Sequence, residues 1–484
     1  MERGRWPFSM TVLEHGAFAF CGLLVYVLVT RIGQHRRQPS AAVAWVLVIA
    51  MFPYVGLPLF LLFGTRKFAR PGVLERSPRA TTAAVRAHLE TLDWDSRQGR
   101  LPPPWATSLL ECFALPPPSK NPVVQFHVDG GQSWQALSEL LQAADRSIDV
   151  CTFVLGHDEV GDALVDELMR ASGRGVRVRL LLDAFGSRRA SRSRLRALET
   201  AGGAVRWFMP LLHNPLRGRT NLRNHRKLAI ADDLTLWSGG RNQAIEYFLD
   251  RSEEPAWEDL SFVVTGPVVN EAQALFEHDW EVASGRVPQS PLRRPTGQYP
   301  LPGTDVGATA QLIPSGPDYA DDTVYSLMLS AAYHARERIL AVTPYFVPDD
   351  ALLSAWCLAC RRGVEVTLLL PARSNHLVAD LARERSLRQL QQAGGRVLLF
   401  PGMLHAKAVV VDDQVALCGT VNLDARSLFL NFELMFAFYD RNEIEWLVAW
   451  IMARCHRSKL HNANLPTWSR DIVEGIVRAV GYQL

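Results

Sequence analysis

The sequence has no strong excess of either charge. Its 484 residues include 52 lysines and arginines against 49 aspartates and glutamates, which gives a formal net charge of +3. A nucleic-acid-binding protein usually concentrates basic residues on one face, so this balance argues against a nucleic-acid partner. Hydrophobic residues make up 48% of the chain, and its length allows two or more domains. We therefore expect a folded protein of more than one domain.

Cysteine is scarce, and its spacing does not indicate a disulfide framework. The seven cysteines are odd in number, scattered, and mostly placed in apolar runs. This pattern is typical of reduced thiols in a reducing compartment. Cys357 and Cys360 have the spacing of a redox or zinc motif, but no second Cys/His pair at zinc-finger spacing accompanies them. We expect both thiols to pack in a helix of the core.

The longest apolar runs lie in the first 70 residues. Residues 16–30 form an uncharged run preceded by Glu14 and His15, and residues 40–65 form a longer run without any charge. A membrane-spanning helix needs about 20 apolar residues, so we predict a transmembrane helical hairpin within residues 1–70. No small-residue cleavage site follows the first run, which argues against a signal peptide. A buried soluble hairpin is the alternative.

Basic residues do not orient this hairpin. Both the loop IGQHRRQPS and the segment after the second run are basic, so the positive-inside rule favours neither topology. The reduced thiols favour a cytoplasmic body. Residues 71–122 are expected to be a connector, because a helical patch (81–94) is followed there by two proline clusters (102–104 and 116–118) that favour extended linkers.

An internal repeat begins at residue 123. ALSELLQAADRSIDVCTFVL and GDALVDELMRASGRGVRVRLLLDAFGS each indicate a helix followed by a strand, and VYSLMLSAAYHARERILAVTPYFV and DALLSAWCLACRRGVEVTLLLPARS repeat that order. Gly175 and Gly363 follow corresponding helices, where glycine suits the C-terminus. Helices alternating with buried strands predict an α/β fold. We expect two α/β halves, 123–283 and 310–484, joined by a Pro- and Gly-rich linker, 284–309.

One motif occurs twice in register. HRKLAIADDLTLWSGGRN begins at His225, and HAKAVVVDDQVALCGTVN begins at His405. Both copies place Lys at +2, Asp at +7, Gly at +14 and Asn at +17 from the histidine. The shared residues are His225, Lys227, Asp232, Gly239 and Asn242 in the first copy and His405, Lys407, Asp412, Gly419 and Asn422 in the second. An extra loop, LLHNPLRGRTNLRN (211–224), precedes only the first copy and is expected to make the halves unequal.

The residue types in this motif suit phosphoryl chemistry. His and Lys two apart on a strand share one face, and each Asp falls at a probable turn. Lysine and asparagine can bind phosphoryl oxygens, while one imidazole attacks phosphorus and the other moves a proton. Asp259 and Glu433, on later strands, are candidates to orient the imidazoles. Neither motif histidine has the short-spaced companions of a zinc or iron ligand, so no metal or other cofactor is expected.

These segments resemble the phospholipase D superfamily and, within it, bacterial cardiolipin synthases. The likeness covers nearly the whole chain and includes the N-terminal hairpin, TPYFVPDD and GTVNLDARSLFLNFE. It implies two halves related by a pseudo-twofold axis, with the motifs meeting between them, and a metal-independent reaction through a phosphohistidine. It implies phosphatidyl transfer between two phosphatidylglycerol molecules, giving cardiolipin and glycerol.

The resemblance also implies roles for individual residues. His225 would be the nucleophile and His405 the acid and base, with Glu433 orienting His405 and Asp259 orienting His225. Asp232 and Asp412 complete the catalytic motifs, with an expected structural role. Lys227 and Lys407 complete the implied catalytic set. The residues implied to bind substrate are Asn242, Asn422 and Ser427, of which Ser427 either binds phosphate or braces its loop.

The resemblance places the protein in the bacterial inner membrane, with membrane phospholipids as its partners. A hydrolytic phospholipase D, with water as acceptor, and a phosphatidyltransferase with another head-group donor are the alternatives. Two features depart from the family. Asn375 stands where an acidic residue is expected, and the tail PTWSRDIVEGIVRAVGYQL lacks the usual Leu- and Pro-rich ending.

Overall fold

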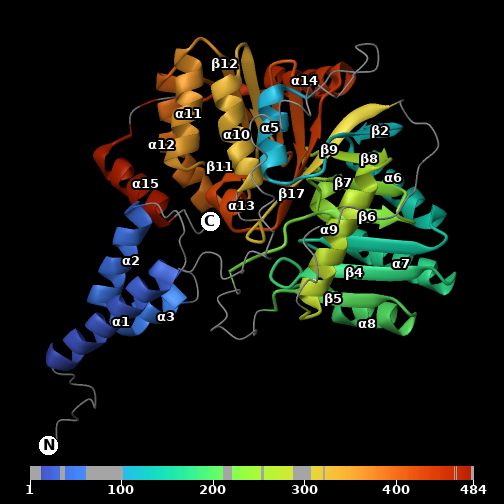
Figure 1. The fold of residues 1–484 in the computed structure, drawn as a ribbon, viewed down its shortest axis with the longest axis horizontal. Helices are drawn as coiled ribbons and strands as arrows, with labels where there is room; N and C mark the ends of the chain where they lie inside the picture. The colour runs from blue at the N-terminus through green and yellow to red at the C-terminus, as the bar shows by residue number, and fades with distance from the viewer. Residues whose placement is uncertain are drawn as a thin grey trace, which may run out of the picture.

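The computed structural model shows an α/β body with a group of N-terminal helices beside it (Figure 1). The structure describes residues 12–32, 39–61, 102–210, 221–251, 255–286, 307–319, 322–462, 464 and 466–480. Three features expected from the sequence lie outside these residues, at least in part. They are the helical patch at 81–94, most of the loop before the first motif (211–220), and residues 287–306 of the linker.

The first half is built on one seven-stranded sheet. The strand order is β2-β8-β7-β6-β3-β4-β5, in which β3, β4 and β5 run parallel and the other neighbours are antiparallel. The strands are β2 (Val123–His127), β3 (Ser147–Thr152), β4 (Arg177–Asp183), β5 (Ala204–Phe208), β6 (Leu228–Ala231), β7 (Thr235–Gly239) and β8 (Ser261–Thr265). The helices are α6 (Gly130–Ala143), α7 (Glu159–Gly173), α8 (Arg192–Thr200), η3 (Ile245–Tyr247) and α9 (Val268–Ala283).

The second half repeats this order within a larger sheet, β1-β9-β17-β15-β14-β10-β12-β13-β18. Read in sheet order, the seven strands from β9 to β13 correspond one by one to the seven strands from β2 to β5 in the first half. The strands are β9 (Ala308–Ser315), β10 (Arg338–Val342), β12 (Glu365–Pro371), β13 (Arg396–Phe400), β14 (Ala408–Val411), β15 (Val415–Gly419), β17 (Glu433–Phe438) and β18 (Lys459–Leu460), with β11 (Phe346–Val347) and β16 (Leu423–Asp424) forming a separate pair. The helices are α10 (Thr323–His334), α11 (Asp350–Arg361), α12 (Leu377–Gln392), α13 (Ala425–Phe429), α14 (Arg441–His456) and α15 (Trp468–Val480).

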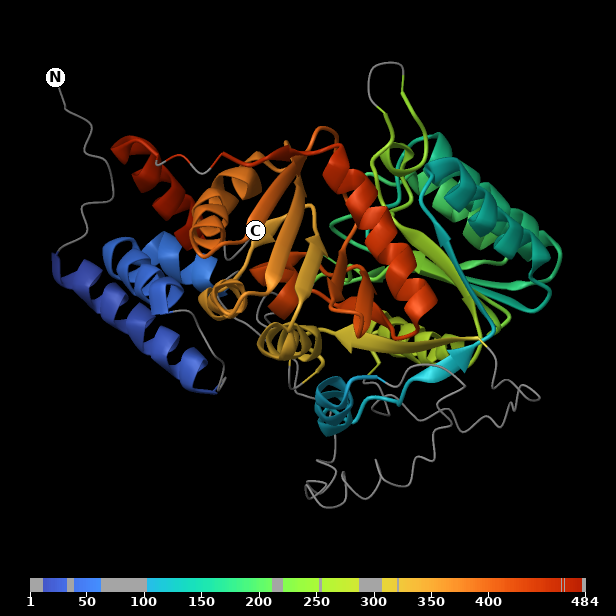
Figure 2. The same cartoon turned by 90° about the horizontal axis from the view of Figure 1, so that it is seen from above.

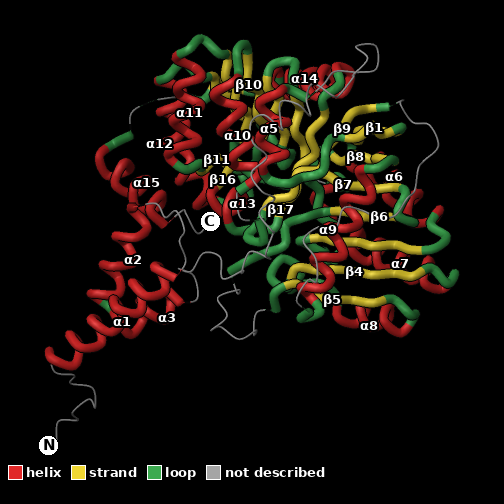
Figure 3. Tube along the Cα trace, viewed as in Figure 1, coloured by secondary structure: helices red, strands yellow, loops and turns green. Residues whose placement is uncertain are grey.

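The repeat predicted from the sequence is therefore a repeat of structure, as the alternation of helix and strand in Figure 3 shows. The two corresponding glycines support it locally. Gly175 and Gly363 follow α7 and α11 with φ of +89° and +90°, a region that glycine enters without steric strain. The prediction of an α/β fold in two halves is confirmed.

Three apolar cores hold the body together. One lies between the first sheet and α6, α7 and α8, and another lies between the second sheet and α10, α11 and α12. The third joins the halves, because Phe262 and Phe276 of the first half pack with Phe436 of the second. The ring centroids of Phe262 and Phe436 are 5.0 Å apart. Figure 2 shows the halves side by side, the first mainly in green and the second in yellow to red.

Residues 102–121, which we call the N-terminal strap, belong to the second half. Helix α5 (Pro104–Cys112) starts with a proline, which costs no hydrogen bond in the first turn, and it buries Ala106 and Leu110 in the second half's core. Strand β1 (Ser119–Asn121) pairs with β9. The expectation of an extended connector is wrong here, because the proline clusters border a packed helix rather than a linker.

Among the described residues before the strap, the helices are α1 (Val12–Ile32), α2 (Pro39–Met51) and α3 (Pro53–Leu59). They contact one another, and Tyr26, Ile49 and Phe60 are buried where they meet. Among the described helices, none combines the length and apolar character needed to cross a membrane. Apolar side chains of this group nevertheless face outward: Phe18, Phe20, Leu24, Val27, Leu28, Leu47, Met51, Phe52 and Val55.

Candidate active site

The two motifs meet between the halves through reciprocal backbone contacts. The N–H of His225 donates to the carbonyl of Phe432 (2.8 Å), and the N–H of His405 donates to the carbonyl of Glu258 (2.7 Å). Each histidine is thereby fixed to a segment of the other half. This reciprocity is what a pseudo-twofold relationship between two halves requires.

Each imidazole is hydrogen-bonded to a carboxylate, but the pairing is crossed relative to the pairing expected from the sequence. The Nδ1 of His225 lies 2.9 Å from Glu433 Oε2, and the Nδ1 of His405 lies 2.7 Å from Asp259 Oδ2. The expected pairs, Glu433 with His405 and Asp259 with His225, are wrong. Glu433 is the first residue of β17, and Asp259 lies two residues before β8, so each carboxylate stands next to the segment that binds the histidine of the opposite half.

Burial keeps both imidazoles in their neutral form. His225 and His405 are only 8% and 3% exposed. Burial lowers the pKa of His225 to about 4, although the adjacent Glu433 opposes this shift. Burial and the Lys407 ammonium lower the pKa of His405 to about 3, against the opposing effect of Asp259. With the carboxylates bound at Nδ1, the Nε2 atoms are left to react.

Both motif lysines are buried beside the histidines. Lys227 Nζ donates to the carbonyl of His225 (2.7 Å), and Lys407 Nζ lies 3.0 Å from His405 Nε2. Burial lowers the pKa of Lys227 to about 7 and that of Lys407 to about 8, even though carboxylates of both halves act in the opposite direction. An anionic group between these ammonium groups would offset the cost of burying their charge.

The motif asparagines have different partners. Asn242 Nδ2 donates to Tyr247 Oη (2.7 Å), and its Oδ1 accepts from the N–H of Val154 (3.3 Å). Asn422 is buried, and its Oδ1 has no hydrogen-bond partner among the described residues. Ser427 is also buried, and its N–H donates to Asp424 Oδ1 (2.7 Å) at the start of α13. Asn422 therefore keeps a polar atom available for a ligand.

Close approach of neighbouring strands fixes the turns that carry these asparagines. A Cβ atom at Gly239 would lie 2.3 Å from the carbonyl oxygen of Leu260, and one at Gly419 would lie 2.4 Å from that of Leu434. Gly239 also has φ of +140°. The glycine at +14 in each motif is therefore required by backbone packing.

Asp232 and Asp412 do not belong to the histidine cluster. Each lies in the turn beyond its motif strand, roughly 20 Å along the chain from the histidine at strand spacing. Asp232 accepts from the N–H groups of residues 145, 146 and 147 at 2.7 to 2.9 Å, and Asp412 from those of residues 336, 337 and 338 at 2.9 to 3.0 Å. These contacts hold the two turns in place, as a structural role requires, and the grouping of both aspartates with the catalytic residues stays a prediction.

Three aromatic rings that the sequence did not single out pack on the imidazoles. Phe153 contacts the ring of His225 with centroids 5.0 Å apart, and Tyr247 and Trp257 contact that of His405 at 5.0 and 5.6 Å. These rings exclude water from the site and increase the desolvation that lowers the histidine pKa values. In the sequence, one of these rings could have been found from the position of Trp257, which lies two residues before the candidate carboxylate Asp259.

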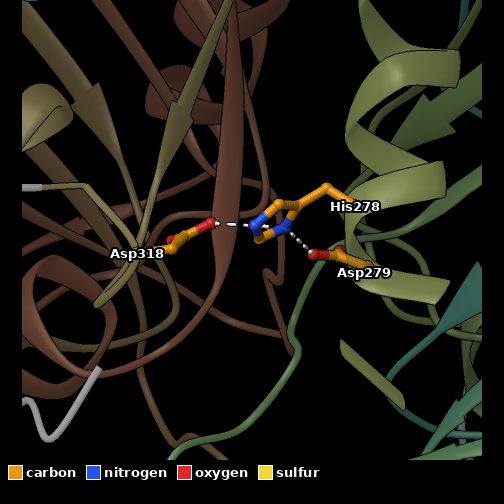
Figure 4. Close-up of side chains that lie close together, drawn as sticks. All are labelled: His278, Asp279 and Asp318. Carbon is orange, nitrogen blue, oxygen red and sulfur yellow. Dashed lines mark ion pairs between the residues drawn. The ribbon is translucent and has the colours of Figure 1, made fainter. Parts of the chain in front are cut away.

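One group of side chains in the described part of the chain has metal-ligand character. Ligand atoms of His278, Asp279 and Asp318 lie within 4.8 Å of one another (Figure 4). However, Arg226 Nη1 lies 2.6 Å from Asp279 Oδ1, and its Nη2 lies 3.7 Å from Asp318 Oδ2. A fully buried guanidinium is a permanent cation. The group therefore fits an ion-pair clamp between the halves better than a metal site.

The comparisons with known proteins agree with this geometry. Residues 137–280 and 328–454 match the family described as "Cardiolipin synthase, PLD-like domain", and residues 22–64 match "Phospholipase D-nuclease N-terminal". The chain is 31% identical to cardiolipin synthase A of Klebsiella pneumoniae subsp. pneumoniae, over 93% of this chain and 94% of that protein. It is 31% identical to the major cardiolipin synthase ClsA of Bacillus subtilis (strain 168), over 89% and 90%.

A solved structure shares the fold. The phosphatidylserine synthase of Haemophilus influenzae Rd KW20 superposes with a TM-score of 0.59 at 14% identity, covering 77% of this chain and 98% of that one. At this identity the likeness concerns the two-half fold alone.

Proposed function

Since the chain belongs to the cardiolipin synthase family of phospholipase D-like proteins, we propose that it transfers a phosphatidyl group between two phosphatidylglycerol molecules. The products are cardiolipin and glycerol. The observation that carries this proposal is the pair of crossed His–carboxylate contacts, with two buried lysines beside them. This arrangement supplies two imidazoles and two cations around one phosphodiester.

In the first step, His225 Nε2 attacks the phosphorus of one phosphatidylglycerol. The new P–N bond forms as the bond from phosphorus to the glycerol oxygen breaks, and protonated His405 donates its proton to that oxygen. His405 is neutral in the free enzyme and takes up this proton when the substrate binds, because the anionic phosphate opposes the Lys407 charge that lowers the pKa of His405. Glycerol leaves, and the phosphatidyl group remains on His225.

In the second step, a hydroxyl of another phosphatidylglycerol replaces the glycerol. His405, now neutral, takes the proton of that hydroxyl as its oxygen attacks phosphorus. The P–N bond breaks, and its electron pair returns to His225 Nε2 as cardiolipin is released. Lys227 and Lys407 hold the non-bridging oxygens through both steps, and the Nδ2 group of Asn422 donates to one of them.

The hydrogen bonds support this division of roles. Lys407 Nζ lies 2.6 Å from Nδ1 and 3.0 Å from Nε2 of His405, so its ammonium group lies against that ring. Within the described part of the chain, no hydrogen bond engages Nε2 of His225, whose Nδ1 faces Glu433 and the carbonyl of Thr420. We therefore assign attack on phosphorus to His225, and acid and base catalysis to His405.

We also propose that α1, α2 and α3 anchor the enzyme as a hairpin in the bacterial inner membrane, with the body on the cytoplasmic side. The 21 residues of α1 extend about 31 Å, close to the roughly 30 Å thickness of the hydrocarbon core. The outward-facing apolar side chains of this group support the proposal. All seven cysteines are free thiols, as expected for a reducing compartment.

An assay with full-length protein in vesicles of phosphatidylethanolamine and phosphatidylglycerol tests the reaction. Cardiolipin with an equal amount of glycerol is the expected result, and a His225→Ala, His405→Ala double variant is the control. Phosphatidic acid with glycerol would instead assign a hydrolytic phospholipase D. Turnover that begins only when another phosphatidyl donor is added would assign a different transferase, and no turnover of any phosphodiester would contradict all three.

A further inference from the structure

Helix α15 packs on α12 through charged side chains. Glu474 is 1% exposed and pairs with Arg388 of α12 and with Arg470, 2.9 Å away, one turn earlier. Arg470 also reaches Glu384 of α12 at 3.5 Å. An amphipathic helix of a water-soluble domain normally buries its apolar face. Here the buried residue on the face toward α12 is a glutamate, and the partly exposed Arg470 lies beside it.

The opposite face of α15 presents apolar side chains. Trp468 is 82% exposed and Ile472 is 42% exposed. They are four residues apart and therefore lie on one face of the helix. Tryptophan combines an apolar ring with a polar N–H and is enriched at the interface between membrane and water.

The start of α12 continues this apolar surface. Arg470 contacts Glu384, and four residues later on both helices Glu474 contacts Arg388. The two helices therefore run parallel. Trp468 then lies near the level of residue 382, and Leu377 lies roughly 8 Å further toward the start of α12. Leu377 and Val378 are 75% and 45% exposed. We call Leu377, Val378, Trp468 and Ile472 the apolar edge.

The apolar edge begins close to the active site. Asn375 and His376, just before α12, contact Tyr345 through a hydrogen bond and an edge-on ring contact. Tyr345 directly precedes β11, which contacts α12 and pairs with β16. Strand β16 starts immediately after Asn422. A lipid that reaches Asn422 along this path would pass the exposed side chains at the start of α12.

We propose that the apolar edge lies in the head-group region of a phospholipid bilayer and admits lipid to the active site. Two observations favour a bilayer over a second copy of the chain. Helix α15 contacts α2 and lies between it and α12 (Figure 1), so the edge continues the outward-facing apolar surface of α1 to α3. Exposed Arg373, four residues before α12, and exposed Arg385, in the middle of α12, complement anionic head groups.

This inference rests on the proposed function only in taking a phospholipid as substrate, and a test without turnover separates the two. Full-length protein would carry the photoreactive residue p-benzoylphenylalanine at position 377, 468 or 472 and be reconstituted in vesicles of phosphatidylethanolamine and phosphatidylglycerol. Position 20 in α1 serves as the positive control. Position 234, where Leu234 is 52% exposed in the β6–β7 turn, serves as the matched exposed control.

Lipid adducts at 377 and 468 but not at 234 are the expected result by mass spectrometry. Adducts at position 20 without any at 377 and 468 would overturn the proposal, and so would protein–protein adducts at 468. Lipid adducts together with absent turnover would keep this docking and reject the proposed function instead.

A kinetic test follows from the same surface. Trp468→Glu combined with Leu377→Glu should lower turnover of vesicle phosphatidylglycerol by about tenfold, because two exposed apolar side chains would no longer enter the lipid. Turnover of a short-chain phosphatidylglycerol below its micelle concentration should be unchanged, as should both rates in Leu234→Glu. An equal loss on both substrates would assign the edge to folding of α12 and reject the docking.

Discussion

The two halves share one strand order, yet they differ at four positions around their histidines. The first half has Arg226, Gly240, Arg241 and Tyr247, and at equal distances from the motif histidine the second half has Ala406, Thr420, Val421 and Ser427. The residues proposed to react, His and Lys, are the same in both halves. The fold thus duplicates the chemistry and varies the side chains that support it.

The pair Gly240 and Thr420 shows how the support is matched to each carboxylate. The hydroxyl of Thr420 donates to Glu433 Oε2 at 2.6 Å. At the corresponding position, a Cβ atom on Gly240 would lie 2.2 Å from Asp259 Oδ1. Glutamate is thus held by a side-chain donor, whereas aspartate needs the space that glycine leaves. The two imidazoles are held alike by different means, which permits different roles.

Removing one histidine at a time should have the largest effect and should show most clearly how the two halves differ. We expect His225→Ala and His405→Ala each to reduce turnover roughly 10⁴-fold. Only His405→Ala should still form the phosphatidyl adduct, because His225 carries it. Rapid acid quenching and intact-protein mass spectrometry measure the adduct. An adduct in His225→Ala alone would exchange the two roles.

Changing the carboxylates tests the crossed pairing. Glu433→Gln should slow adduct formation on His225 by about 10² to 10³, because the imidazole loses the negative charge that orients and stabilises it. Asp259→Asn should act on His405 and prolong the lifetime of an adduct that has formed. Single-turnover kinetics separate the two steps. If Asp259→Asn slowed only the attack by His225, the result would contradict the crossed pairing and indicate that Asp259 orients the histidine of its own half. Gln135→Asn, on an exposed part of α6, is the control.

The residue between His and Lys in each motif tests whether this position contributes differently to fold stability in the two halves. Arg226 is fully buried and binds Asp279, the carbonyl of Glu433 and that of Ser315 across the interface, whereas Ala406 fills the same place with a methyl group. Arg226→Met should destabilise the fold by about 3–5 kcal/mol, because Asp279 is left buried without its cation. Thermal unfolding measures this. Arg441→Met, at an exposed ion pair, should leave the midpoint nearly unchanged.

The smallest expected effect is a dependence of kcat/KM on pH, which arises from the two motif lysines. Burial lowers the pKa of Lys227 to about 7 and that of Lys407 to about 8. The free enzyme therefore loses phosphate-binding charge as the pH rises through this window, and kcat/KM should fall by up to about tenfold per pH unit. Lys227→Arg keeps its charge at these pH values, so any activity it retains should show the falling limb only near pH 8. An unchanged profile would contradict this origin.

The sequence was sufficient where a local pattern decides the structure. The two motifs, the matched glycines Gly175 and Gly363, and the order of helices and strands all follow from residue spacing. The pairing of Glu433 and Asp259 did not follow, because spacing along one strand does not show which half its end reaches. The aromatic contacts of Phe153 and Trp257 were missed for the same reason, since they exist only once distant elements have packed together.

The N-terminal strap has a consequence for how the molecule is made. Ser119 of β1 pairs with Ala310 of β9, and α5 packs against α10. The ribosome thus releases a piece of the second half before it makes any of the first. The strap therefore stays unpaired while the whole first half is synthesised. A protease added during translation should therefore cut the strap in chains arrested before β9 and spare it in completed chains, so that a segment made before either sheet is among the last to be protected.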